Sequence, residues 1–494
     1  MNIETLDPDF CYRVIQAKDA RFDGRIFTCV TSTGIYCRPV CPARTPKKEN
    51  CRFVASAAAA EALGFRSCLR CRPETAPGTP AWAGTQASVA RALRLIEDGA
   101  LDENGVEELA ARVGLGARQL RRLFLAHVGA TPQTVAANRR LLTAKQLITE
   151  TGMSFADIAF AAGYQSLRRF NDAVRASYGV APTSLRRDKS AEVPTQGGNA
   201  ITLRLGYRPP FDWERLLAYL AIRAIPGVEE ISATQYRRSF RLGDAAGIIT
   251  VAPSQKPNAL SIRIQGDGVL PIRQIATRIR RLFDLDADPQ AIAGALRNDA
   301  RLGPRLARAS GIRVPGAFDG FELGIRAILG QQVSVKGATT LAGRVVARAG
   351  TPLTHKDGSL SHYFPAPAAL AAADLSGLGL TGGRIAALKA FAGAVARGEV
   401  NFDPCETLDE KIVELCAVPG IGEWTAHYIA LRAVGEPDAF PASDLGLRKS
   451  AGNGAPIATR ALEQMAEDWR PWRGYAALLL WMVPAIEAAA LAAD

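Results

Sequence analysis

The sequence lacks any segment suited to entering or crossing a membrane. Its first ten residues contain three acidic side chains and no apolar core follows them, so they do not fit a secretory signal. The apolar run at residues 476–493 is interrupted by Pro484 and Glu487, which favours a buried final helix over a membrane span. We therefore expect a cytoplasmic protein without a membrane partner.

Cysteine is scarce beyond the amino-terminal region: of nine cysteines, only Cys405 and Cys416 follow residue 71. In the cytoplasm, such uneven use favours metal binding or catalysis over disulfide bonds. Two closely spaced pairs could offer four thiolates to one tetrahedral zinc ion: Cys37 with Cys41, and Cys68 with Cys71. A purely structural zinc and a zinc that activates a thiolate both fit this spacing. We expect the other three to be small buried residues: Cys11, Cys29 and Cys51.

The length of the chain limits the number of domains, and its charge limits the class of binding partner. A chain of 494 residues is too long for one hydrophobic core, and about three to four domains are expected. The net charge of +12 and the pI of about 9.4 favour a polyanionic partner, with nucleic acid before a membrane surface. Residues 75–87 and 188–200 are rich in Pro, Gly and polar side chains and are predicted linkers.

Residues between these linkers contain a duplicated helix-turn-helix unit. In each copy a short helix, a turn glycine and a second helix follow one another: residues 107–114 and 117–128, then 154–163 and 167–178. The turn residues Gly114 and Gly163 are 49 positions apart, and the closing residues Pro132 and Pro182 are 50 apart. This near-constant spacing indicates a true duplication.

A basic face accompanies the duplication. Residues 109–149 contain seven Lys or Arg and no acidic residue. Such a run is often only a solvated face, but together with a turn glycine and a recognition helix it favours DNA binding. The predicted contacts from the two recognition helices are Arg118, Gln119, Arg122, Gln165, Arg168 and Arg169.

The region after the second linker has a mixed pattern. Segments rich in β-branched residues predict strands, and amphipathic segments predict helices: strands at 201–207, 247–251 and 260–265, helices at 213–225 and 272–282. A small α/β domain is therefore expected here.

A glycine hairpin and a later aspartate carry the chemistry of the carboxy-terminal region. Pro419-Gly420-Ile421-Gly422 stands between two helical segments. A glycine turn at a helix start leaves backbone N–H groups free for a phosphate, although an ordinary turn between packed helices has the same pattern. Gly420 and Gly422 are therefore predicted DNA contacts. Asp444 stands where a loop enters the next helix, so it fits either a cap or a catalytic acid.

A resemblance to the helix-hairpin-helix DNA glycosylases covers residues 415–444 (LCAVPGIGEWTAHYIALRAVGEPDAFPASD). Through residues 321–334 (FELGIRAILGQQVS), 469–473 (WRPWR) and Trp481 it extends to the bacterial inducible 3-methyladenine glycosylase, type II, over residues 201–481. The resemblance implies that Asp444 is the catalytic acid. Its carboxylate would stabilise the cationic sugar, because a base alkylated on a ring nitrogen leaves without being protonated.

Members of that family differ at a few positions, and the residues found there limit which reaction and which cofactor the resemblance implies. Trp424 occupies the position of the lysine nucleophile in members that also cleave the sugar-phosphate backbone, which implies a monofunctional enzyme. No cysteine follows Cys416, so no iron–sulfur cluster is expected. Gln332 stands where the resembled enzyme inserts an apolar wedge into DNA, and Leu445 where it has an aromatic residue. The implied aromatic contacts to a cationic base are Tyr219, Trp424, Tyr428 and Trp481.

The amino-terminal cysteines lie in segments that resemble the Ada adaptive-response proteins over residues 1–75, notably residues 33–44 (TGIYCRPVCPAR) and 64–71 (GFRSCLRC). The resemblance implies zinc-assisted methyl transfer from a DNA methylphosphotriester to Cys37. Four basic side chains nearby in the sequence could hold the phosphates: Arg38, Arg44, Lys47 and Lys48. Residues 88–187 resemble the AraC family, which is the expected second part of an Ada protein. The Pro-Cys-His-Arg site of the usual last Ada domain is absent from the sequence, and the glycosylase-like region takes its place.

These predictions describe a multidomain protein. The four predicted domains are a zinc-bound α/β domain at 1–78, an all-α double helix-turn-helix domain at 86–188, an α/β glycosylase domain at 200–288 and an all-α helix-hairpin-helix domain at 289–494. The implied function is hydrolysis of the N-glycosidic bond of alkylated purines, joined to a methyl-accepting transcriptional activator. We expect one zinc ion per chain, a monomer, association with the nucleoid, and double-stranded DNA and RNA polymerase as partners.

Two alternatives remain. The chain could be a regulator that uses the glycosylase fold only to bind DNA, or a glycosylase whose amino-terminal modules are only DNA anchors. The presence of Asp444 and of the aromatic positions argues against the first alternative.

Overall fold

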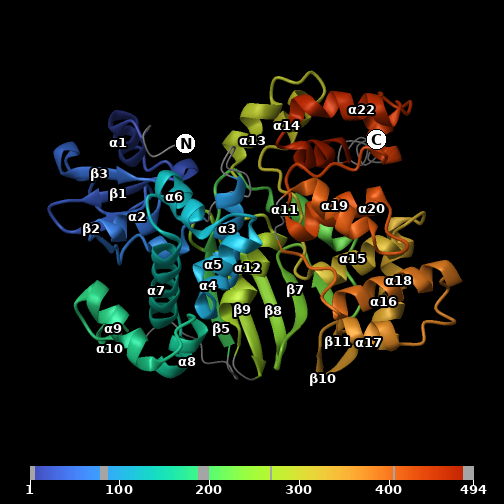
Figure 1. The fold of residues 1–494 in the computed structure, drawn as a ribbon, viewed down its shortest axis with the longest axis horizontal. Helices are drawn as coiled ribbons and strands as arrows, with labels where there is room; N and C mark the ends of the chain where they lie inside the picture. Colours follow the sequence, from blue (N-terminus) through green and yellow to red (C-terminus); the bar gives the residue numbers. More distant parts are fainter. Residues whose placement is uncertain (1–5, 78–86, 187–199, 268–269, 404–406, 482–494) are drawn as a thin grey trace. The chain divides into compact units, whose positions relative to one another are not determined.

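The computed structural model describes residues 6–77, 87–186, 200–267, 270–403 and 407–481 (Figure 1). Contacts divide the chain into two compact units: residues 1–209, 242–277 and 285–287 form the first, and residues 210–241, 278–284 and 288–494 form the second. Most of both predicted linkers, and the predicted final helix beyond residue 481, lie outside the described residues. None of the described helices is long and apolar enough to cross a membrane.

The first unit begins with a four-stranded sheet that carries the paired cysteines. Its strands lie in the order β3-β1-β2-β4, with bounds β1 Phe27–Val30, β2 Ile35–Cys37, β3 Cys51–Val54 and β4 Arg66–Ser67. β1 is antiparallel to β2 and β3, whereas β2 and β4 are parallel, with Tyr36 beside Ser67. This parallel pairing brings Cys37, at the end of β2, close to Cys68, which directly follows β4.

Short helices accompany this sheet: α1 Pro8–Gln16, η2 Ala20–Phe22, η3 Lys48–Asn50, α2 Ala57–Ala62 and η4 Pro73–Thr75. Cys11 and Cys29 are fully buried, as predicted, and burial raises the pKa of the first to about 11 and of the second to about 12. Neither thiol is therefore poised to react.

Cys51 was predicted to be buried but is only half-buried, because its strand β3 lies at the edge of the sheet.

Both predicted helix-turn-helix units are confirmed. The helices of this region are α3 Ala87–Asp98, α4 Ala100–Glu103, α5 Val106–Arg112, α6 Ala117–His127, α7 Pro132–Glu150, α8 Phe155–Ala161, α9 Leu167–Tyr178 and α10 Pro182–Leu185. Gly114 and Gly163, in the turns before α6 and α9, have φ angles of 70° and 89°. These left-handed values favour glycine. Ser154 and Ser166 cap α8 and α9 by accepting backbone N–H groups.

A buried lysine joins the cysteine-bearing sheet to helix α7. Lys145 is 1% exposed, and its ammonium group donates to the Cys68 carbonyl at 2.8 Å and to the Glu74 carboxylate at 2.7 Å. Nearby, the Ser67 hydroxyl lies 2.7 Å from the hydroxyl of Tyr178 in α9. Because a buried cation is costly without such partners, these bonds hold the sheet against the helix-turn-helix region within the first unit.

The three strands predicted after the second linker are also confirmed: β5 Ala200–Gly206, β8 Ala245–Pro253 and β9 Ala259–Asp267. β9 is antiparallel to both neighbours, with Ile264 beside Ile201 and Ile262 beside Val251. These four isoleucine and valine side chains are buried, as expected for one face of a sheet. Helix α12 Ile272–Leu282 follows with the predicted bounds.

The second unit starts with α11 Trp213–Ala221 and an antiparallel pair that the sequence pattern did not predict, β6 Glu229–Ile231 and β7 Tyr236–Leu242. Its other helices are α13 Pro289–Leu296, α14 Leu302–Arg308, α15 Gly320–Leu329, α16 Val335–Ala349, α17 Pro367–Ala372, α18 Gly382–Ala396, α19 Leu408–Cys416, α20 Glu423–Ile429, η6 Ala430–Val434, α21 Leu445–Ala451, α22 Thr459–Ala466 and η7 Glu467–Trp469. A hairpin, β10 Thr351–Asp357 with β11 Leu360–Tyr363, was not predicted either. Residues 473–481 are helical as well.

Helix α15 lies in the core of this unit. Its side chains are buried on nearly all sides, among them Phe321, Ile325 and Ile328. At Gly324 a Cβ atom would lie 2.3 Å from the ring of Phe391, so glycine allows α18 to approach closely. This packing fixes the end of α15, from which the next loop reaches the glycine hairpin between α19 and α20.

The buried lysine generates a prediction for stability. Lys145→Met should leave Glu74 buried without its ammonium partner and lower the opening free energy of α7 by about 3 kcal/mol or more. Hydrogen exchange of the α7 amides in the full chain measures this effect. Arg397→Met, which removes an exposed ion pair with Glu399, is the matched control and should change exchange little. Equal α7 protection in both variants would contradict the assigned role of Lys145.

Candidate active site and metal centre

A cavity of about 1180 Å³ in the second unit collects the predicted glycosylase residues. Its walls come from α11, the loop between α15 and α16, α18, the glycine hairpin, α20, the start of α21 and residue 481. All the predicted substrate and hairpin contacts line it: Tyr219, Gln332, Gly420, Gly422, Trp424, Tyr428, Asp444 and Trp481. Folding thus brings together residues that were predicted from separate parts of the sequence.

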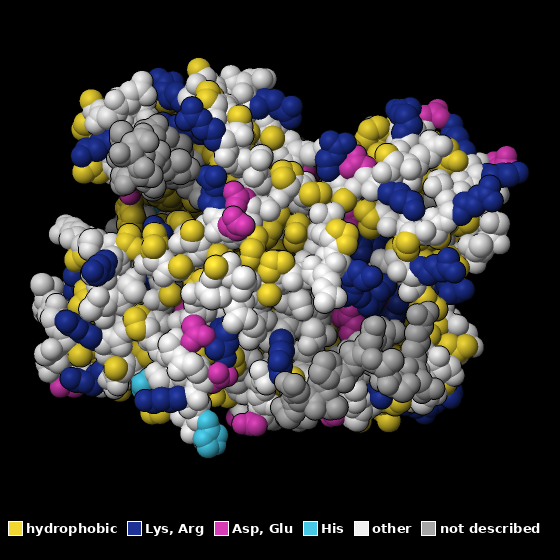
Figure 2. Space-filling model, turned by 180° about the vertical axis from the view of Figure 1, so that it is seen from behind, with side chains coloured by type: hydrophobic (Ala, Val, Ile, Leu, Met, Phe, Trp, Pro, Cys, Tyr) yellow, Lys and Arg dark blue, Asp and Glu magenta, His cyan; other side chains and the backbone are white. Residues whose placement is uncertain are grey.

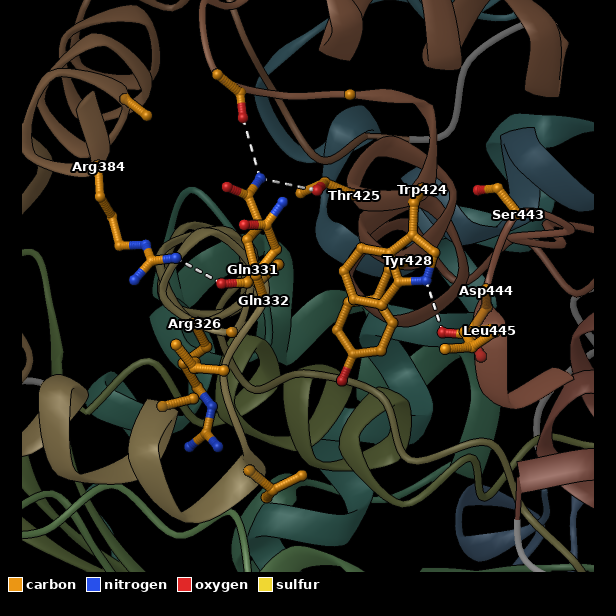
Figure 3. Close-up of a pocket in the computed structure, with 18 of the residues that line it drawn as sticks. Arg326, Gln331, Gln332, Arg384, Trp424, Thr425, Tyr428, Ser443, Asp444 and Leu445 are labelled. Carbon is orange, nitrogen blue, oxygen red and sulfur yellow. Dashed lines mark hydrogen bonds between the residues drawn. The ribbon is translucent and has the colours of Figure 1, made fainter. Parts of the chain in front are cut away.

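Asp444 is both a helix cap and a member of the cavity wall. Its carboxylate accepts the backbone N–H of Leu447 at 2.9 Å and so caps α21. It also accepts the indole N–H of Trp424 at 2.8 Å, drawn in Figure 3, and that of Trp481 at 3.0 Å. Three N–H donors from three segments therefore hold this carboxylate in one orientation. Leu445, beside it on the cavity wall, is 54% exposed.

The glycine hairpin has the geometry that its sequence predicts. Gly420 has a φ of 90°, and a Cβ atom there would lie 2.4 Å from the Cβ atom of Ala387 in α18. Glycine is thus favoured by backbone conformation and by space. Gly422 is the residue before α20, where no side chain caps the helix, and both glycines are exposed. The backbone N–H groups at this helix start are available to an anion.

Aromatic rings form one wall of the cavity. Trp424 and Tyr428, one helical turn apart on α20, are stacked with ring centroids 5.3 Å apart and an interplanar angle of 9°. Trp481 meets Tyr428 edge to face at 6.4 Å. Figure 3 shows the Trp424 and Tyr428 rings lying parallel between Asp444 and the paired glutamines 331 and 332. Such faces can bind a planar or cationic base.

Two arginines beside this wall were not predicted: Arg432, which is buried, and Arg223, which lines the cavity. Arg432 is 5% exposed, donates to the carbonyl of Pro315 at 2.6 Å, and also donates to the hydroxyl of Tyr428. Arg223 lies 3.8 Å from the ring centroid of Tyr219. Burial opposes ionisation of Tyr428, but Arg432 and Arg223 together lower its pKa to about 8. The four-residue spacing of Tyr428 and Arg432 was the available signal, since it places both on one helix face.

A glutamine that the sequence pattern did not single out connects the loop after α15 to the hairpin. The Gln331 amide donates to the Gly420 carbonyl at 3.0 Å and to the Thr425 hydroxyl at 3.1 Å. Arg384 of α18 donates to the backbone carbonyl of Gln331 (Figure 3). The loop that carries Gln332 is therefore anchored to two other elements of the cavity.

In the first unit, the four paired cysteines converge. The sulfur atoms of Cys37, Cys41, Cys68 and Cys71 all lie within 4.8 Å of one another. Thiolates bound to one zinc ion at about 2.3 Å are about 3.8 Å apart, so the four residues fit a tetrahedral site. Backbone N–H groups also point at two of the sulfurs, from Arg38 to Cys71 at 3.4 Å and from Arg70 to Cys68 at 3.3 Å. Such bonds orient metal ligands.

The proximity of the four sulfurs alters their acidity. A hydrogen bond from Cys37, with a further contribution from Cys71, lowers the pKa of Cys41 to about 7. Bonds from Cys37, Cys41 and Cys71 lower the pKa of Cys68 as well. Bonds with the neighbouring sulfurs raise the pKa of Cys37 and of Cys71, so Cys41 and Cys68 are the two held toward the anionic form that binds a metal ion.

A second cavity, of about 520 Å³, opens beside Cys37. Arg44, Arg66 and Arg70 line it, and none of the three guanidinium groups has a carboxylate partner among the described residues. Arg44 was a predicted phosphate contact, whereas Arg66 and Arg70 were not, although they flank Cys68 in the motif that carried the prediction. Arg38, the other predicted phosphate contact, also lines the cavity, and its guanidinium donates to Asp23, to the Cys71 carbonyl and to Thr75.

Some of the predicted DNA contacts on the recognition helices are exposed, whereas others are hydrogen-bonded within the protein. Arg118, Gln119 and Arg122 are exposed on α6, and Arg168 is 93% exposed on α9. Gln165 instead donates to the Asp102 carbonyl at 3.0 Å and accepts from Arg169 at 3.2 Å. Figure 2 shows Lys and Arg side chains in separate groups on one face of the molecule, one of them within a hollow.

Comparison with protein families gives three matches along the chain. Residues 10–74 match the metal-binding domain of Ada, residues 109–188 match a helix-turn-helix domain, and residues 202–319 match the AlkA N-terminal domain. The three matches fall in the order that the sequence motifs indicate.

Known proteins extend this picture. The chain is 44% identical, over 96% of both chains, to a Mycobacterium tuberculosis protein named "Probable bifunctional transcriptional activator/DNA repair enzyme AlkA". The present chain is also 37% identical to DNA-3-methyladenine glycosylase 2 of Escherichia coli, over 56% of this chain and 95% of that protein. A 3-methyladenine DNA glycosylase of Archaeoglobus fulgidus shares its fold over 56% of this chain and 97% of that one, with a TM-score of 0.50 and 22% identity. The chain therefore belongs to the family in which an Ada-type regulator is fused to an AlkA-type, helix-hairpin-helix glycosylase.

Proposed function

We propose that this protein releases alkylated purines from double-stranded DNA by hydrolysing the N-glycosidic bond, and that it also accepts methyl groups from DNA methylphosphotriesters and activates transcription. The observation that carries the glycosylase proposal is the Asp444 carboxylate, held by two indole N–H groups in a cavity with a stacked aromatic wall. A protein that only bound DNA would have no need for that constellation. Similarity to the Escherichia coli glycosylase supports the same reaction.

The glycosylase reaction follows from these residues. A nucleotide extruded from the duplex, at a cost of roughly a few kcal/mol, would place its base against Trp424, Tyr428 and Trp481. As the bond to the base breaks, positive charge develops on the sugar. The Asp444 carboxylate would stabilise this charge and orient the attacking water. The side chain at position 424 donates its N–H to Asp444 and has no amine, so a Schiff base cannot form there and the enzyme is monofunctional.

The methyl-acceptor reaction would take place in the first unit. Cys37, Cys41, Cys68 and Cys71 would hold one zinc ion, which keeps the sulfurs anionic and nucleophilic when bound. The Cys37 sulfur would attack the methyl carbon in line, forming the S–CH₃ bond while the CH₃–O bond breaks and its electrons go to the phosphate oxygen. Arg44, Arg66 and Arg70 are the groups suited to holding the surrounding phosphates. Since a thioether does not return the methyl group, each chain would react once.

Transcriptional activation would use the two helix-turn-helix units. Exposed side chains on α6 and α9, among them Arg118, Gln119, Arg122 and Arg168, are suited to reading a promoter. The protein would act as a monomer that recruits RNA polymerase. The four-domain division at residues 1–78, 86–188, 200–288 and 289–494 belongs to the same proposal.

Substitution of the catalytic acid tests the first activity. Asp444→Asn should lower base release about 100- to 1,000-fold while DNA binding stays nearly unchanged, because the amide retains the cap but not the charge. Release of methylated bases from alkylated DNA and affinity for the same DNA measure the two effects. Glu463→Gln, which changes an exposed carboxylate in α22 that does not line the cavity, is the control and should keep full activity. More than about a tenth of wild-type turnover in Asp444→Asn, a loss of 1.4 kcal/mol or less, would exclude Asp444 as the catalytic acid.

Metal analysis tests the cysteine site. The purified full chain should contain one zinc ion, and Cys68→Ser should contain less than about a tenth of that amount, because three thiolates and a hydroxyl bind zinc far more weakly. Cys51→Ser, outside the four-sulfur cluster, should keep the full zinc content. Equal zinc content in the two variants, measured by elemental mass spectrometry, would place the metal elsewhere.

A further inference from the structure

Arg432 is a buried cation beside the base cavity. Its guanidinium donates to the carbonyls of Pro315 at 2.6 Å and Gly316 at 3.3 Å, and also to the hydroxyl of Tyr428. Within the described part of the chain, no carboxylate forms an ion pair with this guanidinium; the carboxylate of Glu229 instead lies near two other arginines. Because a buried cation is costly without an anion, Arg432 favours negative charge on the Tyr428 oxygen.

Helix α11 adds two groups that favour the same charge. Arg223 lies over the ring of Tyr219, and the Tyr219 side chain is hydrogen-bonded to Tyr428. Burial raises the pKa of Tyr219, so that phenol keeps its proton and donates it to the Tyr428 oxygen. Burial also opposes ionisation of Tyr428, but the two arginines outweigh it and lower the pKa of Tyr428 to about 8.

The remaining charged groups of this region do not cancel the two arginines. On α15, Arg326 lines the cavity, and its guanidinium lies 3.7 Å from the Glu229 carboxylate of β6. Glu229 also lies 3.8 Å from Arg238, which pairs with Glu322 at 2.7 Å. With Arg432 and Arg223, four guanidinium groups therefore stand against two carboxylates.

This excess of positive charge opposes the binding of a cationic base. In Figure 3 the Tyr428 ring lies between Asp444 and Arg326. A cationic base against that ring is repelled by nearby guanidinium groups unless one of their charges is neutralised. An ionised Tyr428 neutralises one charge and presents an anionic ring, which attracts a cation more strongly than a neutral ring does. A neutral base gains no such attraction.

We propose that Arg432 and Arg223 hold Tyr428 as a tyrosinate, and that this tyrosinate makes the cavity select cationic bases over neutral bases of the same shape. The inference rests on the proposed glycosylase function and names how that site distinguishes bases by charge. The phenol proton passes to solvent. Tyr428 contacts the base, whereas Arg432 acts through Tyr428 and is a positioning residue. Since Tyr428 becomes anionic as the pH rises, the preference for a cationic base increases with pH and is lost as the pH falls.

An ultraviolet titration of the full chain tests the tyrosinate directly. The wild type should show one tyrosine that ionises with a midpoint near pH 8. Tyr428→Phe, which keeps the ring but lacks the phenol, should lose this step, and Arg432→Met should move its midpoint above about pH 9. Tyr12→Phe, which removes a phenol in the first unit, is the control and should keep the step.

Binding measures the selection by charge. Full chain carrying Asp444→Asn, which leaves the base attached, is titrated with duplexes that contain 3-methyladenine or 3-deaza-3-methyladenine, in which carbon replaces the charged ring nitrogen. The anionic fraction of Tyr428 rises from about a tenth at about pH 7 to about three quarters at about pH 8.5. The preference for the cationic base should therefore rise about five- to eightfold over this range, and less than about twofold when Tyr428→Phe is added.

Each result bears on a separate step. The absence of a tyrosinate step below about pH 9 in the wild type, or an equal rise in preference with and without Tyr428→Phe, would overturn the proposal. A wild-type midpoint in Arg432→Met would remove Arg432 from it. The Tyr428→Phe comparison leaves Arg432 in place, so it decides the proposal even where Arg432→Met does not fold. Failure to bind either modified duplex more tightly than undamaged DNA would instead contradict the glycosylase function, and the ultraviolet titration would still show whether Tyr428 ionises.

Discussion

The arrangement of the cavity in the second unit depends on the hydrogen bonds that hold the Asp444 carboxylate. An aspartate that only capped α21 would need the bond to the Leu447 N–H and nothing more. The indole N–H groups of Trp424 and Trp481 add two further constraints, and each comes from a different helical segment. The position of Trp424 in turn depends on the hairpin, where Gly420 allows α20 to start close against α18. The cavity, the aromatic wall and the hairpin thus form one arrangement around a single carboxylate.

In the first unit, the surrounding elements hold the four paired cysteines in a comparable way. The parallel pairing of β2 and β4 brings the two cysteine pairs together, and Lys145 fixes the strand end at Cys68 to helix α7. Three arginines without carboxylate partners surround the neighbouring cavity, whereas Arg38 is used to hold the Cys71 loop. This separation of structural and available cations is consistent with a site that must meet phosphate groups while its metal ligands stay in place.

The zinc site, the helix-turn-helix units and the glycine hairpin could be predicted because each depends on residues at a short, fixed spacing in the sequence. The cysteine pairs, the turn glycines of the duplicated helices and the hairpin before Trp424 are each short patterns whose residues act close together in sequence. The parts that escaped prediction depend on tertiary contacts. Arg66 and Arg70 face the Cys37 cavity only because β4 pairs with β2. Gln331 reaches Gly420 across 89 positions. Arg432 is buried and donates to the hydroxyl of Tyr428, and the Arg38 guanidinium donates to Asp23, which lies 15 positions earlier in the chain.

In the proposed function, one chain combines catalytic base release with a single methyl capture. It is tested most directly by incubating the protein with DNA that carries radiolabelled methyl groups and counting label in two places over time. The account predicts that free methylated bases accumulate well beyond the amount of protein, while label on the protein rises to about one methyl group per chain, on Cys37, and stops. Label on the protein without released bases, or released bases without label on the protein, would contradict it.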